Sequence, residues 1–142
     1  MIRLTNFADY AVVLMSELAK EKDRRASAQE LSKTTKIPAP TVSKVLNALG
    51  QGDLLQSHRG LKGGFSLSRP ASDINIAQII EAVDGPICLT ECSNGESNND
   101  CSLSETCEIR AHWPPINQAV RSSLSTISLA YISQIETQST NT

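Results

Sequence analysis

The sequence has few aromatic side chains and, near its N-terminus, no uninterrupted hydrophobic run. Hydrophobic residues make up 39% of the 142 residues, which is enough for a core, but aromatic residues make up only 4%. Asp9 and Glu17 interrupt the first hydrophobic segment, which argues against a signal peptide or a membrane span there. We therefore expect a protein of the reducing cytoplasm with no membrane partner. The length suits one modest domain, or one domain with an oligomerisation element.

Several catalytic and metal-binding patterns are also missing. The sequence has no paired acid and base, and neither His58 nor His112 lies in a nucleophile motif, so we do not expect an enzyme. No two cysteines have the Cys-x2-Cys spacing that is usual in zinc sites. The closely spaced cysteines of bacterial ferredoxins are absent as well, which argues against an electron carrier.

Charge is distributed unevenly along the chain. Residues 1–69 hold 11 Lys and Arg against 6 Asp and Glu, whereas residues 70–142 hold 2 against 9. The first part therefore carries a net charge of +5 and the second of -7, a contrast that the total of -2 conceals. A basic segment is the expected electrostatic signature of a phosphate-binding surface. The acidic part should face away from nucleic acid.

Hydrophobic periodicity and turn residues predict a series of short elements in the first half of the chain. Ser27 and Glu30 match a capping box, and Asn75 matches a helix cap. The predicted elements are helices over residues 6–20, 27–35, 39–49 and 76–83 and strands over residues 54–57 and 65–67. The first helix is expected to turn one face inward: Phe7, Ala11, Leu14, Met15 and Leu18. This order predicts a mainly α fold with a small β wing, a winged helix-turn-helix DNA-binding domain over residues 1–84.

The third predicted helix, residues 39–49, would enter the major groove of double-stranded DNA. Its aliphatic face points inward, which turns four polar candidates for base and phosphate contacts outward: Thr41, Ser43, Lys44 and Asn47. At the glycine-rich tip of the wing, Arg59 and Lys62 are candidates for contacts along or in the minor groove. The alternative is that all six are ordinary exposed residues. The basic charge of this half favours DNA binding.

The second half of the chain predicts one long helix that follows a loop over residues 85–112. Pro114 and Pro115 stand where a helix can begin. Hydrophobic residues then recur at steps of three and four, which predicts a dimerisation helix over residues 113–136: Trp113, Ile116, Val120, Leu124, Ile127 and Tyr131. The alternative is that this stripe packs on the first helix of its own subunit. The polar tail, residues 137–142, is expected to be disordered.

All four cysteines lie between Cys88 and Cys107, in a polar, acidic and turn-forming segment. Clustered thiols on such a loop in a reducing compartment favour a metal site over disulfides. The spacing of Cys92, Cys101 and Cys107 is wide, and iron–sulfur clusters tolerate wide spacing and a non-cysteine ligand. The alternatives are a zinc site and a thiol–disulfide switch.

The chain resembles the IscR/NsrR/RirA family of iron–sulfur transcription regulators over roughly residues 1–135. The resemblance rests on RLTNFADYAV, HRGLKGGFSLSRP and IAQIIEAVDG in this order, followed by the three spaced cysteines and Trp113. It implies a transcription regulator, most often a repressor, which binds a partly palindromic operator as a homodimer with one cluster in each subunit. The closest likeness is to members that control SUF-type iron–sulfur assembly genes, and nitric-oxide-sensing repressors are the alternative within the family.

The same resemblance suggests the cluster ligands. Cys92, Cys101 and Cys107 match the three cysteine ligands of the family, whereas Cys88 has no counterpart. Some members use a histidine three residues after the last cysteine, where this chain has Arg110. Others use an aspartate from the partner subunit within an Arg-Leu-Thr-x-x-x-Asp pattern, which Asp9 matches. Asp9 has an alternative role, since an acidic side chain in the first turn complements the helix dipole. Neither pattern decides between a 2Fe-2S and a 4Fe-4S cluster.

Overall fold

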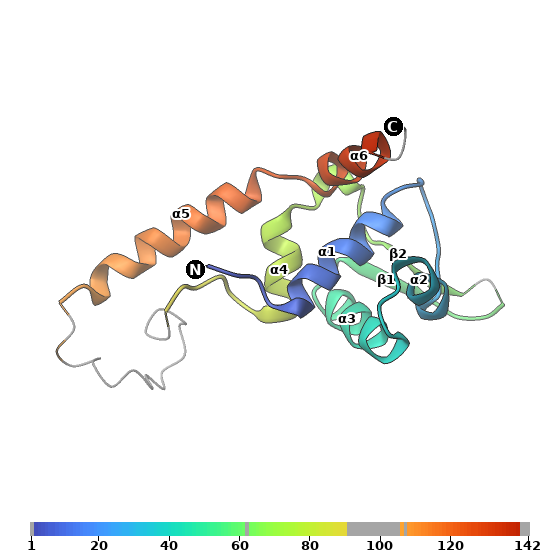
Figure 1. Ribbon diagram of the computed structural model, residues 1–142, viewed down its shortest axis with the longest axis horizontal. Coiled ribbons are helices and arrows are strands. Elements are labelled where there is room, and N and C mark those ends of the chain that lie inside the picture. Colours follow the sequence, from blue (N-terminus) through green and yellow to red (C-terminus); the bar gives the residue numbers. More distant parts are fainter. Residues whose placement is uncertain (1, 62, 91–105, 107, 140–142) are drawn as a thin grey trace.

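The computed structural model describes residues 2–61, 63–90, 106 and 108–139 (Figure 1). Helices dominate, and one antiparallel hairpin is the wing, which confirms the predicted fold class. The helices are α1 (Asn6–Leu18), α2 (Ala28–Thr35), α3 (Ala39–Gln51), α4 (Ile76–Asp84), α5 (Trp113–Ser125) and α6 (Leu129–Ser139). The strands are β1 (Leu55–His58) and β2 (Gly64–Leu67), and two short 3-10 helices are η1 (Ala71–Asp73) and η3 (Arg110–His112).

Side-chain caps determine where several helices begin. The Thr5 hydroxyl accepts a hydrogen bond from the Ala8 backbone N–H and starts α1. Ser27 and Glu30 form the predicted capping box of α2, at 3.1 and 3.2 Å. Asn75 caps α4 as predicted, and its own backbone N–H donates to the side chain of Gln78. Each cap satisfies backbone donors that a helix start leaves unpaired.

The core is aliphatic and lies where α1, α3 and α4 pack together. The predicted inward face of α3 is fully buried: Val42, Val45, Leu46 and Leu49. Four of the five residues predicted to share one face of α1 are buried: Ala11, Leu14, Met15 and Leu18. The fifth, Phe7, is 36% exposed. It lies on the same side of the helix as Ala11 and Leu14 but in the first turn, at the end of the buried face.

The wing is anchored to the helical body by its second strand. β1 and β2 pair antiparallel, with Leu55 opposite Leu67. Phe65 also forms a bridge with Ala26, through backbone hydrogen bonds of 2.8 and 3.1 Å. Gly64 allows this close approach, since its φ is +135° and a Cβ there would lie 2.6 Å from the Ala26 carbonyl oxygen. A side chain at this position would push the wing away from the segment that precedes α2.

The predicted single helix over residues 113–136 is wrong, because the chain breaks between α5 and α6. The break pairs with the segment before α4: the Ile76 N–H donates to the Ile127 carbonyl at 3.0 Å, and the Leu129 N–H donates to the Ile74 carbonyl at 2.8 Å. Leu129 is fully buried in the core. This pairing and burial replace the helical continuation that the local pattern favours. The tail expected to be disordered from Thr137 also differs, since α6 continues to Ser139.

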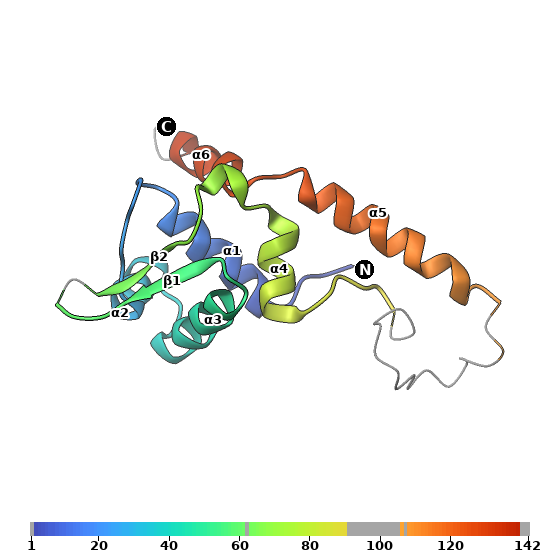
Figure 2. The ribbon, with the colours of Figure 1, turned by 180° about the vertical axis from the view of Figure 1, so that it is seen from behind.

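Figures 1 and 2 show how the parts are arranged. α5 projects from the body formed by α1 to α4, and the wing points away from the opposite end of the molecule. The N-terminal segment, residues 2–5, runs beside α4 and α5 in both views. α6 returns to pack on α1 and η1. Within the described ranges, none of these helices combines the length and apolar character needed to cross a membrane.

Candidate nucleic-acid interface and cysteine segment

The exposed side of α3 lies opposite its four buried aliphatic residues. Ser43, Lys44 and Asn47 are exposed there, whereas Thr41 is half-buried. α3 begins at Pro38 and Ala39 without a side-chain cap. The backbone N–H groups of Ala39 and Thr41 in its first turn are therefore available to an anion such as a DNA phosphate, whereas Pro40 has no N–H. This arrangement suits insertion of α3 into the major groove with its N-terminus leading.

A groove of about 380 Å³ separates α3 from the wing. Its lining comes from both elements: Leu46, Asn47, Gly50, Gln51, Leu55, Ser57 and Phe65. Asn47 thus faces both the exposed side of α3 and this groove. The polar part of this lining, near exposed Lys44, can accommodate a phosphate backbone that passes between α3 and the wing.

At the wing tip, Arg59 is exposed, as expected of a cation that contacts DNA, whereas Lys62 lies outside the described residues. Two features there were missed by sequence reasoning. Leu61 is fully exposed on the turn, and His58 at the base bonds through Nε2 to the Ser66 hydroxyl at 2.7 Å. The sequence pattern of the hairpin predicted neither the exposure of Leu61 nor the bond between His58 and Ser66, because both depend on how the hairpin folds.

The residues that flank the cysteine segment are tied together on both sides. The Thr5 hydroxyl donates to the Asp84 carboxylate at 2.6 Å, joining the start of α1 to the end of α4. The Leu89 backbone N–H donates to the side-chain oxygen of Asn117 at 2.9 Å, and Asn117 is only 7% exposed. These contacts place the beginning of the cysteine segment against both the helical body and α5.

A salt bridge supports the same junction. The Arg121 guanidinium contacts the Glu81 carboxylate at 2.6 Å and holds α5 against α4. Beside it, an apolar groove of about 540 Å³ is lined by the N-terminal segment, the end of α4 and α5. Half-buried Cys88 lies in this groove. Sequence reasoning did not single out Asn117, Arg121 or Glu81, because their partners are distant in the chain.

Cys92, Cys101 and Cys107 lie outside the described residues, so their role as ligands stays a prediction. The described residues themselves contain no group of three or more His, Cys, Asp or Glu placed to hold a metal ion.

Asp9 is exposed in the first turn of α1. Its carboxylate makes no hydrogen bond or ion pair with the part of the chain that is described. The Asp9 carboxylate is therefore free to contact a group outside its own subunit.

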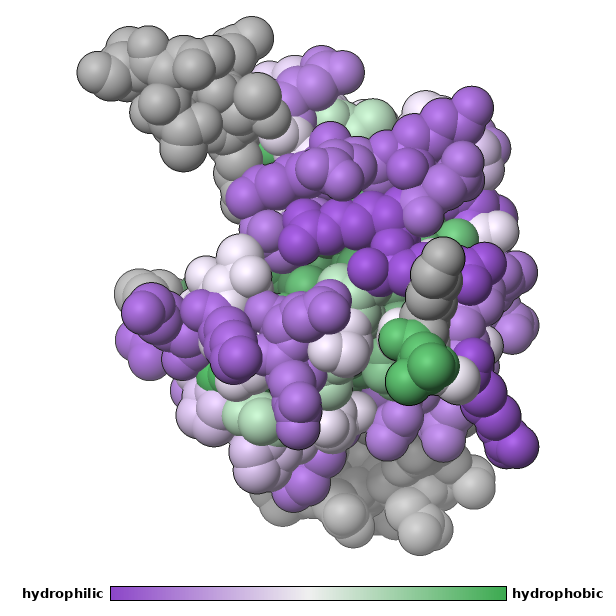
Figure 3. Space-filling model, turned by 90° about the vertical axis from the view of Figure 1, so that its right-hand side faces the viewer, coloured by the Kyte–Doolittle hydropathy of each residue, from purple (hydrophilic) through white to green (hydrophobic). Residues whose placement is uncertain are grey.

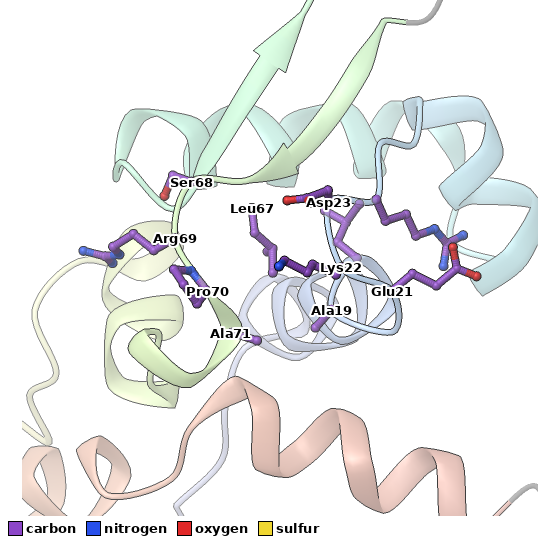
Figure 4. Close-up of a pocket in the computed structure, with 11 residues that line it drawn as sticks. Ala19, Glu21, Lys22, Asp23, Leu67, Ser68, Arg69, Pro70 and Ala71 are labelled. Atoms are coloured by element: carbon purple, nitrogen blue, oxygen red, sulfur yellow. The ribbon is translucent and has the colours of Figure 1, made fainter.

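A separate cavity lies away from α3, between the end of α1 and the segment that follows β2 (Figure 4). It has a volume of about 430 Å³, and Lys22, Asp23 and Leu67 lie along it while Arg69 extends to one side. Charges of both signs line it, so it selects no single class of charged ligand. Nearby, Glu17 bonds to Lys20 and Arg24 at 2.6 and 3.2 Å.

Glu17 has a shifted pKa because its environment contains opposing influences. Burial raises the pKa of its carboxyl, but the hydrogen bonds and positive charges of Lys20 and Arg24 outweigh this effect. The pKa therefore lies below its ordinary value of 4.5, and Glu17 is charged at neutral pH. This cluster fixes the end of α1 to the linker before α2, and it lies outside the interface described above.

Comparisons with known proteins agree with the arrangement. Residues 4–134 match the Rrf2 family, described as iron-dependent transcriptional regulators. The chain is 28% identical over 110 residues to the transcriptional regulator NsrR of Shouchella clausii, which covers 77% of this chain and 73% of the relative. It is 30% identical over 129 residues to the transcriptional regulator IscR of Photorhabdus laumondii, which covers 90% of this chain and 77% of the relative.

A solved structure, CymR, the global cysteine regulator of B. subtilis, has the same fold, with a TM-score of 0.72 and 24% identity. The alignment covers 95% of this chain and 98% of CymR. These matches confirm the resemblance to IscR and NsrR and the winged-helix fold. The relatives are transcriptional regulators, which confirms that the chain is not an enzyme. The chain belongs to the Rrf2 family of DNA-binding transcriptional regulators.

Proposed function

We propose that this regulator is a cytoplasmic homodimer whose operator binding is controlled by an iron–sulfur cluster. The observation that carries the proposal is the position of the cysteine segment. It is inserted between α4, which packs in the DNA-binding body, and α5, which projects from it. A group bound by this segment is therefore well placed to change how the two parts sit against each other.

The contacts at the junction support such coupling. Asn117 links α5 to the backbone at Leu89, which is three residues before Cys92. Thr5 links the end of α4 to the start of α1. A group that orders the cysteine segment would therefore act over a short distance on α5 through Asn117, and on α4 and α1 through the bond between Thr5 and Asp84.

The donor chemistry fits a cluster. Iron–sulfur clusters prefer thiolate ligands, and Cys92, Cys101 and Cys107 match the three cysteine ligands of the IscR/NsrR/RirA pattern. A cluster would supply a redox-active iron centre that reacts with small ligands. The Asp9 carboxylate, which is exposed and has no partner among the described residues, fits a fourth ligand contributed to the partner subunit. Such an oxygen ligand exchanges more easily than a thiolate, which favours sensing of nitric oxide or oxygen.

Dimer formation through α5 is supported by exposed apolar surface. Ile116 on α5 is 42% exposed, and Ile2 and Leu4 of the adjacent N-terminal segment are 78% and 47% exposed. Burial of such surface is the main favourable contribution to association. A single winged helix also contacts too few base pairs for useful specificity, whereas a symmetric dimer reads two half-sites.

The test is to purify the protein without oxygen and count iron and sulfide per chain. Wild-type protein should show visible charge-transfer absorbance, and its affinity for DNA selected from a random library should change when the cluster is removed. Cys92→Ala, Cys101→Ala and Cys107→Ala should each lose the cluster, whereas the matched control Cys88→Ala should keep it. Colourless wild-type protein without sulfide contradicts the proposal.

A second candidate is a regulator without a cluster, which responds to thiols or holds zinc. The fold similarity to CymR favours it, since CymR is named as the global cysteine regulator of B. subtilis. Operator affinity that changes with thiol oxidation, in protein that contains no sulfide, would support this alternative.

For the cluster-controlled regulator, we further propose that the target genes encode iron–sulfur cluster assembly proteins. Mapping binding sites across the genome of the source organism checks this proposal.

A further inference from the structure

The leucine at the tip of the wing has no role in holding the fold together. Leu61 is 109% exposed, the largest value among the large hydrophobic side chains in the described ranges. It occupies a corner of the turn closed by the Gly63 N–H, which donates to the Gly60 carbonyl at 2.9 Å. Turn corners usually carry polar residues, glycine or proline. Because this leucine contributes nothing to the core, its side chain is free to contact a molecule outside the chain.

The base of the wing tip is constrained by close backbone contacts. A Cβ on Gly63 would lie 2.6 Å from the His58 carbonyl oxygen, so only glycine allows this turn. Below the tip, the bond between His58 and buried Ser66 joins the two strands of the hairpin, and the bridge from Phe65 to Ala26 connects the hairpin to the body. Leu61 therefore projects from a constrained base at the far end of the wing.

The surroundings of the tip are polar and basic. The end of the molecule that carries the wing is largely hydrophilic over its surface (Figure 3). Arg59, two residues before Leu61, is exposed at the same tip. An isolated leucine beside an arginine suits a surface that is both anionic and partly apolar. The minor groove of DNA has these properties, since phosphates border it while sugar rings and base edges line it.

We infer that Leu61 enters the minor groove when the wing docks and selects A·T over G·C pairs there. The physical reason is the guanine 2-amino group, a hydrogen-bond donor that projects into the minor groove of G·C pairs only. A leucine side chain cannot accept this hydrogen bond, and covering the amino group would leave it without water. Against an A·T pair, the same side chain covers no such donor. The inference rests on operator binding in the proposed function and not on the cluster.

The experiment uses three duplexes derived from the DNA that the wild-type protein selects. Hydroxyl-radical footprinting locates the minor-groove position under the wing, and that base pair is made A·T, G·C or inosine·C. Inosine keeps the major-groove face of guanine and lacks the 2-amino group. Wild-type protein should bind the A·T and inosine·C duplexes about fivefold to tenfold more tightly than the G·C duplex, which corresponds to covering one donor group without a hydrogen-bond partner.

Leu61→Ala should bind the A·T duplex about fivefold more weakly and lose most of the discrimination against G·C. Its dependence on salt should match that of wild type, since no charge is removed. Arg59→Ala serves as the contrast, because loss of a phosphate contact should reduce the salt slope by about one. A Leu61→Ala variant that keeps the wild-type preference for inosine·C over G·C overturns the inference. Failure of the wild-type protein to select any DNA overturns the proposed function itself.

Discussion

The attachment of α6 to the core can be tested by shortening one side chain. Leu129 is fully buried immediately after the break between α5 and α6, whereas Ile127, two residues earlier, is 37% exposed. Leu129→Ala removes three buried carbon atoms and leaves a cavity, which costs about 3 kcal/mol. For a chain of 142 residues this lowers Tm by about 10 °C. Ile127→Ala removes partly exposed surface and should cost about 1 kcal/mol or less.

Thermal unfolding followed by circular dichroism at one protein concentration gives both values. The expected result is a Tm for Leu129→Ala that lies several degrees below that of Ile127→Ala. In a single continuous helix over residues 113–136, residues 127 and 129 would lie on different faces of a projecting rod, and neither would be essential to the core. Equal Tm values for the two variants would therefore refute the break and the pairing with residues 74–76.

Three further predictions concern α3, the Glu17 ion pairs and the exposed face of α5. Lys44→Ala should weaken operator binding by about 1–3 kcal/mol and reduce its salt slope, whereas Lys20→Ala, which pairs with Glu17 outside the candidate interface, should leave the slope unchanged; gel-shift titrations at several salt concentrations decide. Because the folded pKa of Glu17 is lowered, its ion pairs stabilise the protein above pH 4.5, and this stability is lost as the pH falls through the folded pKa. Glu17→Gln should therefore lower the urea midpoint more at pH 7 than at pH 3, and an equal deficit at both would contradict the assignment. Ile116→Asp, on the exposed face of α5, should yield monomers in sedimentation, and a dimeric variant would place the interface elsewhere.

Local patterns were sufficient to predict the DNA-binding body. The capping box at Ser27 and the cap at Asn75 depend only on residues three positions apart, and both formed as expected. The aliphatic spacing of α3 likewise depends on helix geometry alone. In each case the physical cause acts within one or two turns of helix, so the sequence window contains all the information.

The break between α5 and α6 shows where such patterns fail. Ile127 and Tyr131 continue the hydrophobic spacing of α5, and the segment between Ser125 and Leu129 has neither glycine nor proline. The helix ends there because the backbone pairs with Ile74 and Ile76, about fifty residues earlier in the chain. Asn117 was missed for the same reason, since its partner is a backbone N–H 28 residues away. Long-range backbone partners of this kind leave no periodic trace in the sequence.

The attachment of α5 is uneven, and this bears on how a bound group could alter operator binding. Its C-terminal end is fixed by the backbone pairing at Ile127 and by buried Leu129, and its middle by the salt bridge of Arg121. Towards its N-terminal end the described contact is the bond from Asn117 to Leu89, next to the cysteine segment. A helix of 13 residues is about 20 Å long, so a tilt of about 5° around the fixed end moves the other end by about 2 Å. In a dimer formed through α5, that displacement changes the separation of the two α3 helices, which must match half-sites about 34 Å apart. Under the proposed control, the cysteine segment therefore acts at the end of α5 where a small force has the largest effect on DNA binding.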